Sequence, residues 1–590
     1  MRFVNPSVLP GLLILVIGLV LNSCGNSENT NPASGRSKTM ILHLPNDPQG
    51  MNPVNSIGAD AAYLHSLVFD HLIALDFETL QLVPQVAETM PEISEDRTRM
   101  TFHMRKDVKF TDGKVMTAKD VEFSFKAIMN PYVDSAPRRV ELQNLSNCVA
   151  EDDHTVTFSL TNAGPFDLNK MAINFFVLPQ HIYDPEGLTD AYTAAEARMA
   201  ERRPDSVTPD LELRLLAFAD FFDDEKFQRE KGFVVGSGKF NFDGWQAGQY
   251  IRLVRNRNYW NKDIAVGMDT VIFKTIPDIQ TAFQSLKSGE IDFGDDFTPE
   301  QFKDQMNGED FGKHFEKKAL PFPFYEYVGW NTKVSGSGRK SIFADAKVRR
   351  AMAHLINVDE IISNVMMETA EPIQSLVYKD RPEYNTNLVA YEFNPERATS
   401  LLEEAGWKDS NGDGILDNEM EGELVDFEFA LYYRRGNEMR ERIARHIKAK
   451  MEKVGIKVET KDLDWKVMLE RLKKHTLDAW IGGWVYDSDE QDLYSLFHSS
   501  QILNSGYNWT SYNNPRADSV MEAIVHEWDQ DKRYQLHKEI QQILHQDQPY
   551  TYLFANSARI AYNKRLANDK WYGQRPCYQV WEFQLAKSPN

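Results

Sequence analysis

The sequence predicts a multidomain α/β fold, for three reasons. The chain of 590 residues is longer than one hydrophobic core usually supports, so we expect several domains. Short apolar or alternating runs, such as MTFHMR, HTVTFSL and YIRLVRN, are typical of strands. Helical patterns lie between them, and in AKDVEFSFKAIM (118–129) the spacing puts Val121, Phe125 and Ile128 on one face. Strands that alternate with helices favour α/β domains.

The expected elements follow one another from near Thr39, where MILHLP reads as a strand that enters a turn. Thr117 is expected to cap the helix over 118–129. Further helical patterns cover 347–362 and 395–405, the latter with proline at its start. Residues 184–231 are charged, helical in pattern and interrupted by prolines, which predicts a helical insertion on the surface.

Composition and motifs argue against a nucleic-acid partner and against catalysis. The net charge is −21, whereas phosphate binding needs clustered Lys and Arg. The chain lacks H-E-x-x-H, and Val235 stands where G-x-S-x-G needs its first glycine. Phe233 and Phe240 prevent GSGKF from serving as a phosphate loop, and the 14 histidines show no metal-ligand spacing. No cofactor is therefore expected, although missing motifs do not exclude catalysis, because catalytic groups can lie far apart in the sequence.

The amino terminus predicts export. A positively charged start precedes an apolar run, residues 8–21, which is too short for a comfortable membrane span. The following Leu21-Asn22-Ser23-Cys24 resembles the lipobox of bacterial lipoproteins. That resemblance implies removal of residues 1–23 and lipidation of Cys24, with residues 24–38 as a flexible tether to the membrane. An ordinary signal peptide or a signal anchor is the alternative.

The most informative stretch is residues 473–518. A strand-like run ends in Gly482, Gly483 and Trp484, and the carboxylate of Asp487 follows closely. An acid at the exit of a buried strand, beside an aromatic side chain and flexible backbone, suits recognition of an ammonium group. The alternative is an aspartate that caps a turn.

This stretch, Trp484-Val485-Tyr486-Asp487 included, resembles the ligand-binding crossover of bacterial dipeptide- and oligopeptide-binding proteins of ABC importers, solute-binding protein family 5. Six further blocks match this family in its order: 47–54, 110–128, 232–260, 282–294, 343–357 and 401–417. The match therefore spans nearly the whole chain after the tether.

The resemblance implies a two-lobed fold of the periplasmic-binding-protein type II kind. Lobe 1 is expected to comprise residues 39–275 and 500–590, with a family-specific extra domain over about 81–184, and lobe 2 to comprise residues 276–499. The chain should cross between the lobes near Ile276-Pro277 and again between Asp487 and Tyr507.

The resemblance also implies a set of ligand-binding residues. In the family the acid at the position of Asp487 pairs with the amino terminus of the peptide, and backbone groups at Gly483 and Val485 bond its main chain. Arg434 and Arg435 are candidates for the carboxylate of the ligand, and we favour Arg435. The alternative for both arginines is a solvated loop charge.

Aromatic residues are further candidates for the lining of the site. The resemblance places Trp330-Asn331 on a strand that faces the cleft in the family, and Trp484 and Tyr507 are further candidates. For each of them a place in the core is the favoured reading and contact with the ligand is the alternative. Ile481 stands where some family members carry an arginine that binds the ligand carboxylate, so strict selection of peptide length is not expected.

Two features leave alternatives open. Asp409, Asn411 and Asp413 are spaced as in a calcium loop, but the bidentate Glu at its last ligand position is missing, so a plain turn is the alternative. Cys148 and Cys577 could pair in an oxidising compartment, and the sequence does not decide this.

Taken together, these features predict a monomeric lipoprotein on the periplasmic face of the cell envelope. It should capture di- or oligopeptides by lobe closure and deliver them to a permease and ATPase complex. The family also contains binders of nickel, haem and oligosaccharides, so a non-peptide solute is the first alternative. A periplasmic hydrolase and a calcium-dependent structural lipoprotein are the others.

Overall fold

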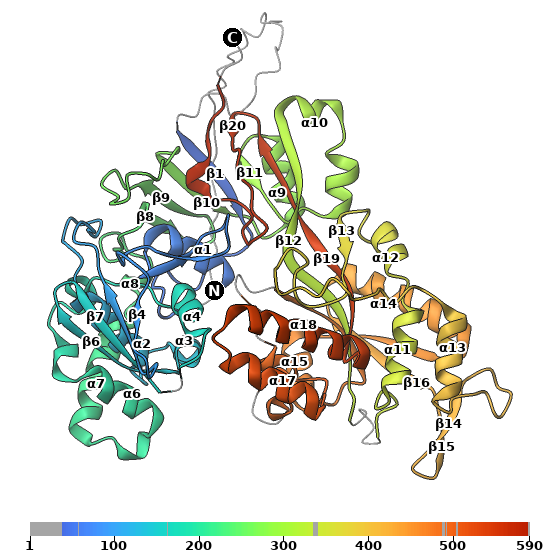
Figure 1. The fold of residues 1–590 in the computed structure, drawn as a ribbon. Coiled ribbons are helices and arrows are strands. Elements are labelled where there is room, and N and C mark those ends of the chain that lie inside the picture. Colours follow the sequence, from blue (N-terminus) through green and yellow to red (C-terminus); the bar gives the residue numbers. More distant parts are fainter. Residues whose placement is uncertain are drawn as a thin grey trace, which may run out of the picture.

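A computed structural model describes the chain over residues 38–56, 58–161, 163–333, 340–485, 490, 493–502 and 506–587. Its ribbon forms two bodies joined by two long strands, β12 (Phe315–Trp330) and β19 (Tyr550–Asn563), as Figure 1 shows. We call the body that contains the amino-terminal strand the first body. The second body is built around the carboxyl-terminal half of β12 and the helices after residue 340.

One mixed sheet runs through both bodies. Its strand order is β17-β16-β18-β12-β19-β11-β1-β10-β9-β8, and β13 (Ala370–Pro372) pairs with β19 outside this path. In the first body its strands are β1 (Thr39–Leu44), β8 (Phe240–Gln246), β9 (Tyr250–Arg255), β10 (Thr270–Thr275) and β11 (Phe293–Gly294). In the second body they are β16 (Glu428–Arg434), β17 (Lys457–Leu463) and β18 (Ala479–Val485).

The first body carries a second sheet, in the order β4-β5-β7-β6. Its strands are β4 (Glu92–Ile93), β5 (Arg99–His103), β6 (Leu145–Asp152) and β7 (Thr155–Leu160). The first helices of this body are α1 (Ala59–Val68), α2 (Ala118–Met129), α3 (Ala136–Glu141), α4 (Asp167–Asn174) and α5 (Gln180–Tyr183), and of these α2 packs on the second sheet. Helix α2 has the predicted bounds, and the Thr117 N–H donates to Asp120 Oδ2 at 2.8 Å, which closes its first turn. Buried side chains of both sheets form one continuous core.

Residues 184–231 form helices, as predicted. They are α6 (Ala194–Arg202), α7 (Pro209–Phe222) and α8 (Lys226–Arg229). The insertion does not lie wholly on the surface, because Phe218 and Phe222 are fully buried and their rings contact Phe123 of α2. Its inner face is therefore part of the core of the first body.

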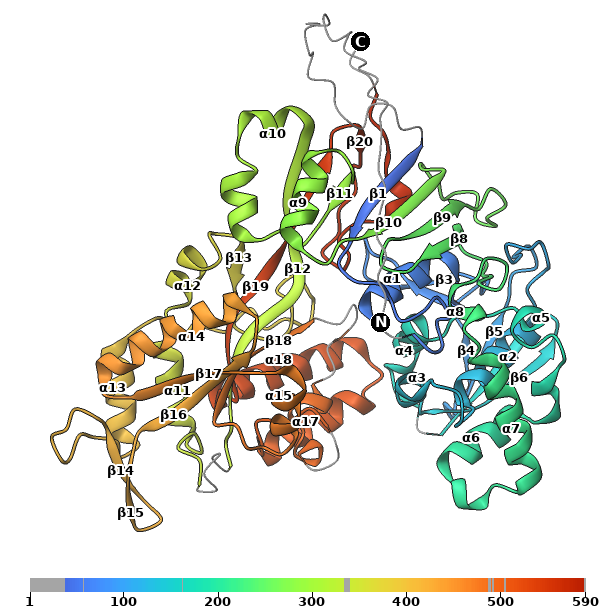
Figure 2. The ribbon, with the colours of Figure 1, turned by 180° about the vertical axis from the view of Figure 1, so that it is seen from behind.

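Helices cover both faces of the sheet in the second body (Figure 2). They are α11 (Ala346–Leu355), α12 (Val358–Asn364), α13 (Pro395–Glu404), α14 (Glu438–Met451), α15 (Trp465–Lys473), α16 (Tyr494–Phe497), α17 (Pro515–His526) and α18 (Gln530–Asp547). The helix predicted over 347–362 is in fact two helices. Asn357 interrupts it, because its Oδ1 accepts the Glu360 N–H at 3.0 Å and so caps α12.

Helices α17 and α18 pack in the second body, whereas the expected lobe boundary at residue 500 would assign them to the first. Buried side chains of α17 and α18 share a core with Tyr327, Tyr432 and Trp480 of the second-body sheet. The chain rejoins the core of the first body after β19, where Leu566 and Tyr578 are buried. Sequence blocks cannot show this, because the side of a crossing on which a helix packs depends on contacts distant in sequence.

The remaining elements connect these parts. They are β2 (Ile73–Leu75), β3 (Leu82–Pro84), α9 (Ile279–Lys287), α10 (Glu309–His314), β14 (Asp417–Met420), β15 (Glu423–Asp426), β20 (Leu566–Ala567) and β21 (Gln584–Leu585). Cys148 and Cys577 are both buried free thiols, so no disulfide joins them in this structure. Within the described ranges no helix has the length and apolarity that a membrane span requires.

Candidate ligand-binding site

Three neighbouring strands of the second body end at the same edge of the sheet. β16 pairs in parallel with β17, which places Arg434 opposite Leu463, and it also pairs in parallel with β18. The edge where these strands end, which we call the carboxyl edge, carries Arg434, Arg435, Trp465 and Val485. In open α/β sheets ligands bind outside the carboxyl ends of parallel strands, so this edge is the candidate site.

The two sides of β18 are paired to different extents. On one side all seven residues, Ala479–Val485, are in register with Phe324–Trp330 of β12. On the other side, pairing in register with β16 covers only two residues of β18. Ala479 pairs with Leu431, and Trp480 pairs with Tyr432. Within the described residues, Ile481–Val485 therefore have no strand paired in register on the side that faces β16. A strand edge of this kind can accept an extended main chain.

A buried ion pair lies beneath this part of β18. The Arg440 Nε on α14 donates to Glu326 Oε2 at 3.0 Å, and its Nη2 donates to Oε1 at 3.3 Å. Burial raises the pKa of Glu326, and the opposing charge of Arg440 does not cancel the rise. Gly483 pairs with Glu326 in the ladder, and a Cβ on Gly483 would lie 2.8 Å from Arg440 Nη2. The glycine thus leaves room for the pair.

Three aromatic rings form a wall beside the end of β18. The Trp484 ring stacks on Trp509 with centroids 5.3 Å apart, and it meets Tyr507 edge-on at 5.5 Å. Tyr507 is 47% exposed, whereas Trp509 is 5% exposed. His475 supports the wall, because its ring nitrogens lie 3.1 Å from the Trp509 carbonyl and 2.9 Å from that of Ile502. The structure therefore brings the predicted residues Trp484 and Tyr507 together.

The two candidate arginines differ in their partners. Arg435 Nε donates to Asp462 Oδ2 at 2.6 Å, and this hydrogen bond raises the pKa of Arg435. Arg434 is exposed, and no ion pair to it is found within the described part of the chain. A ligand carboxylate would have to compete with Asp462 for Arg435. The geometry therefore favours Arg434 over Arg435, which is the reverse of our expectation from the sequence.

Trp330 and Asn331 do not lie at the carboxyl edge. Trp330 pairs with Ala479, at the opposite end of β18 from Val485. Both side chains are fully buried: the Trp330 Nε1 donates to Thr551 Oγ1 at 2.9 Å, and the Asn331 amide donates to the carbonyls of His475 and Leu477. Their polar atoms are used within the core, as the core reading of these two residues expects, so they do not form part of the candidate site at the carboxyl edge.

The oxygen atoms of the NGDG loop also have partners of their own. Asp409 accepts the N–H groups of Gly412 and Gly414, while Asn411 and Asp413 accept those of Asp413 and Ile415. Among the described residues no group of three or more His, Cys, Asp or Glu side chains is placed to hold a metal ion. The loop has the hydrogen bonds of a plain turn.

Two predicted residues fall outside the described part of the chain. Asp487 lies between Val485 and Glu490, and Cys24 lies in the segment before Lys38. Their proposed roles therefore stay predictions. What sequence reasoning missed is the pair of Glu326 and Arg440. A signal was present, since a glutamate inside the apolar run FYEYVGW needs a buried partner.

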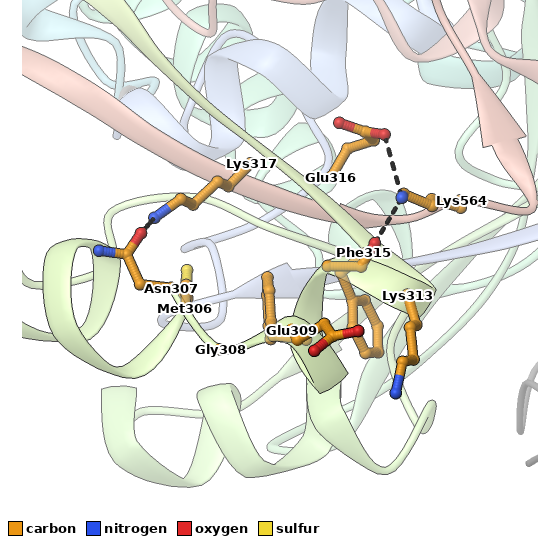
Figure 3. Close-up of a pocket in the computed structure, with 11 residues that line it drawn as sticks. Met306, Asn307, Gly308, Glu309, Lys313, Phe315, Glu316, Lys317 and Lys564 are labelled. Carbon is orange, nitrogen blue, oxygen red and sulfur yellow. Dashed lines mark hydrogen bonds and ion pairs between the residues drawn. The ribbon is translucent and has the colours of Figure 1, made fainter.

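A pocket of about 490 Å³ lies elsewhere, between α10 and the start of β12 (Figure 3). Three lysines line it, and each already has a partner. Lys317 Nζ donates to Asn307 Oδ1 at 2.6 Å, Lys564 lies 3.5 Å from Glu316, and Lys313 bonds Asp310. The pocket lies along β12 well before Phe324, which pairs with the end of β18, so it is not part of the carboxyl edge.

Comparison with known proteins identifies the family. The model "Bacterial extracellular solute-binding proteins, family 5 Middle" matches residues 81–504. The oligopeptide-binding protein AppA of Bacillus subtilis is 28% identical over 98% of both chains. Heme-binding protein A of Haemophilus influenzae is 25% identical over 91% of this chain and 92% of its own.

Solved structures agree in fold. The B. subtilis AppA structure, in complex with a nonapeptide, superposes with a TM-score of 0.68 at 27% identity, covering 93% of this chain and 99% of that one. NikZ from Campylobacter jejuni, in complex with Ni(L-His), gives 0.70 at 21% identity with 93% and 99% coverage, which shows the shared α/β fold. The chain belongs to family 5 of the bacterial extracellular solute-binding proteins, the non-enzymatic binding components of ABC import.

Proposed function

We propose that this protein captures a peptide outside the cytoplasm and delivers it to the permease and ATPase of an ABC importer. The observation that carries the proposal is the side of β18 that faces β16, where Ile481–Val485 extend beyond the registered ladder. A peptide main chain can add to such an edge through backbone hydrogen bonds that do not depend on its side chains. The nonapeptide complex of the relative AppA supports this choice of ligand.

The ends of the peptide would be held by charge. Arg434 stands at the carboxyl edge with its guanidinium exposed, so it can form a two-point contact with a carboxylate. Asp487, predicted from the sequence, would pair with the amino terminus. Trp484 and Tyr507 would pack against side chains of the ligand at the aromatic wall.

Closure of two lobes around the ligand completes the proposed mechanism. In our revised division, lobe 1 comprises residues 39–275, including the extra domain over 81–184, and the chain after β19. Lobe 2 keeps the expected start at residue 276, apart from β11, whose Phe293 lies in the first-body core. It also includes α17 and α18, because these helices share the second-body core. Ligand that contacts both lobes favours the closed state over the open one.

A non-peptide solute is the second candidate. Heme-binding protein A resembles the chain nearly as closely as the peptide binders do, at 25% identity over 91% of this chain. The exposed ring of Tyr507 and the half-buried ring of Trp484 could also stack on a flat ligand.

We further propose that Cys24 is lipidated and holds the protein on the periplasmic face of the envelope.

Native mass spectrometry of the protein, purified from its own cells under non-denaturing conditions, tests the ligand class. A co-purifying series of peptide masses would support the proposal, and haem or a metal complex would favour the second candidate. Isothermal calorimetry with a dipeptide, a tripeptide and a nonapeptide then measures affinity. Failure of all three to bind protein that has been stripped of ligand and refolded would contradict the peptide assignment.

A further inference from the structure

Arg533 on α18 fastens two separate segments of the second body. Its Nε and Nη2 donate to Glu490 Oε2 and Oε1, both at 2.6 Å, and each side chain of this pair is 9% exposed. Its Nη1 also donates to the Glu527 carbonyl at 2.9 Å, in the connection between α17 and α18. Glu490 follows Asp487 closely in the sequence. One guanidinium therefore ties Glu490 to the α17–α18 connection.

The same guanidinium also meets the first body. Its central carbon lies 5.6 Å from the centroid of the Phe166 ring, which precedes α4. Beside this contact, the Arg97 guanidinium lies 4.7 Å from the ring of Trp528. In both Figure 1 and Figure 2 the end of the α17–α18 pair lies beside α3 and α4. Arg97 and Phe166 thus contact the second body where Arg533 is anchored. We call these two cation–π contacts the inter-body contact.

The charged groups around Arg533 keep the ion pair intact. His537 Nε2 lies 3.4 Å from Glu490 Oε2, and Glu383 and Tyr534 also face the cluster. Burial raises the pKa of Glu490, but the hydrogen bonds from Arg533 and the nearby ring of His537 outweigh burial and leave this pKa lowered. Glu490 is therefore ionised near neutral pH. Its partner Arg533 is positively charged, so the pair is neutral as a whole.

We propose that Arg533 is a positioning residue that couples contact between the two bodies to the placement of Glu490. The edge of the guanidinium binds Glu490, and its face is covered by Phe166 when the bodies meet. This inference rests on the proposed function, in which the bodies close on a ligand held at the carboxyl edge.

The coupling follows from electrostatics. Phe166 shields the Arg533–Glu490 pair from water, and a charge pair of this kind attracts more strongly when water is excluded. Closure therefore favours the anchored position of Glu490. Since coupling free energies are reciprocal, a ligand that favours the anchored position of Glu490 favours closure in turn.

The first experiment measures opening without any ligand. Dyes on Val140→Cys in the first body and Val389→Cys in the second report the distance between the bodies by single-molecule energy transfer. Val140 and Val389 are 61% and 76% exposed, and the native thiols at 148 and 577 are buried. With Cys24, the third cysteine, replaced by alanine, labelling is selective. The test variants are Phe166→Leu and Arg533→Lys, alone and combined. Arg516→Lys, an exposed arginine of α17 paired with Glu539, is the matched control.

Phe166→Leu and Arg533→Lys should each increase the open population several-fold. Phe166→Leu should do so with a melting temperature close to that of the parent, whereas Arg533→Lys should also lower it, because it disturbs the buried pair with Glu490. Together they should open the protein no further than the stronger single variant does, because both remove one contact. Phe166→Tyr keeps a ring and should restore the parental population, and Arg516→Lys should not change it. Should Arg533→Lys fail to fold, Phe166→Leu and Trp528→Leu decide the matter. An open population equal to the parental one in both would overturn the proposal.

A ligand arm separates this inference from the proposed function. If the parent binds a nonapeptide, Arg533→Lys should weaken that binding by about tenfold, mainly through faster dissociation. Unchanged affinity in Arg533→Lys would overturn the coupling. If the parent binds no peptide at all, the proposed function fails, while energy transfer in the ligand-free protein still decides whether Arg533 and Phe166 control opening.

Discussion

Gly483 and Arg440 compete for the same space: Arg440 Nη2 lies 2.8 Å from the point that a Cβ on residue 483 would occupy. The strand that is proposed to receive the ligand thus depends on a glycine, because an arginine passes beneath it to reach Glu326. The proposed binding strand and the buried ion pair are therefore in contact, and a substitution at Gly483 should affect both ligand binding and stability.

Gly483→Ala should therefore destabilise the protein. The added methyl group would displace Arg440 or Phe324, and a disturbed buried ion pair costs about 2–4 kcal/mol in the free energy of unfolding. Urea denaturation measures this. Gly244→Ala is the control, because a Cβ at that strand position meets no atom within 4 Å. Equal losses in the two variants would show that the contact with Arg440 does not matter.

Arg434→Ala should weaken binding of a peptide with a free carboxyl terminus by about tenfold or more, since a charged hydrogen bond is lost. Arg435→Ala should have a smaller effect, because Asp462 already engages that guanidinium. Calorimetry with a free and a carboxyl-amidated peptide measures both effects. If Arg435→Ala proves the more damaging variant, and only for the free acid, our choice between the two arginines is wrong.

Asp487→Asn should weaken binding of peptides with a free amino terminus by about 1.5–3 kcal/mol, because a charge-assisted bond to an ammonium group is removed. An acetylated peptide should bind the variant and the parent equally. Asp409→Asn, in the exposed NGDG turn, serves as the control. The same loss for acetylated and free peptides would contradict the assigned role of Asp487.

Glu383→Gln should stabilise the protein at neutral pH. Burial raises the pKa of Glu383, helped by the nearby charge of Glu490 and opposed by its own backbone, Arg381 and His537. The folded state then holds its proton more tightly than the unfolded state does. Stability from this group is therefore present below the unfolded pKa and lost as pH rises through the folded pKa.

The gain from Glu383→Gln should be on the order of 1 kcal/mol at pH 7 and should vanish in mildly acidic solution. Thermal unfolding at several pH values measures it. Glu186→Gln, at an exposed position, is the matched control and should show no such trend. A gain that is independent of pH would mean that ionisation of Glu383 is not its cause.

Cys24→Ala should release the protein from membranes, because the proposed acyl chains would have no attachment point. Fractionation of cells, followed by immunoblotting of the soluble and membrane fractions, measures this. Cys148→Ala, at a buried thiol, is the control and should leave the protein in the membrane fraction. Retention of Cys24→Ala with the membranes would exclude lipid as the anchor.

Sequence patterns predicted many elements well, because helix and strand periodicity is a local property. The bounds of α2 were predicted correctly, and α13 begins at Pro395 as expected, with Asn394 as its cap. The pattern over 347–362 failed only where the Asn357 side chain competes with the helix for backbone N–H groups. Trp484 and Tyr507 were chosen together, and their rings do meet.

The sequence by itself determined the α/β class, the family and the strand with its glycines, since each of these depends on residues close together in the chain. Only the tertiary structure decided that Trp330 is used in the core, that Asp462 engages Arg435, and that α17 and α18 belong to the second body. These facts depend on which faces and charges meet across long sequence separations. Sequence periodicity cannot predict such long-range contacts, because they depend on burial and pairing in the folded chain.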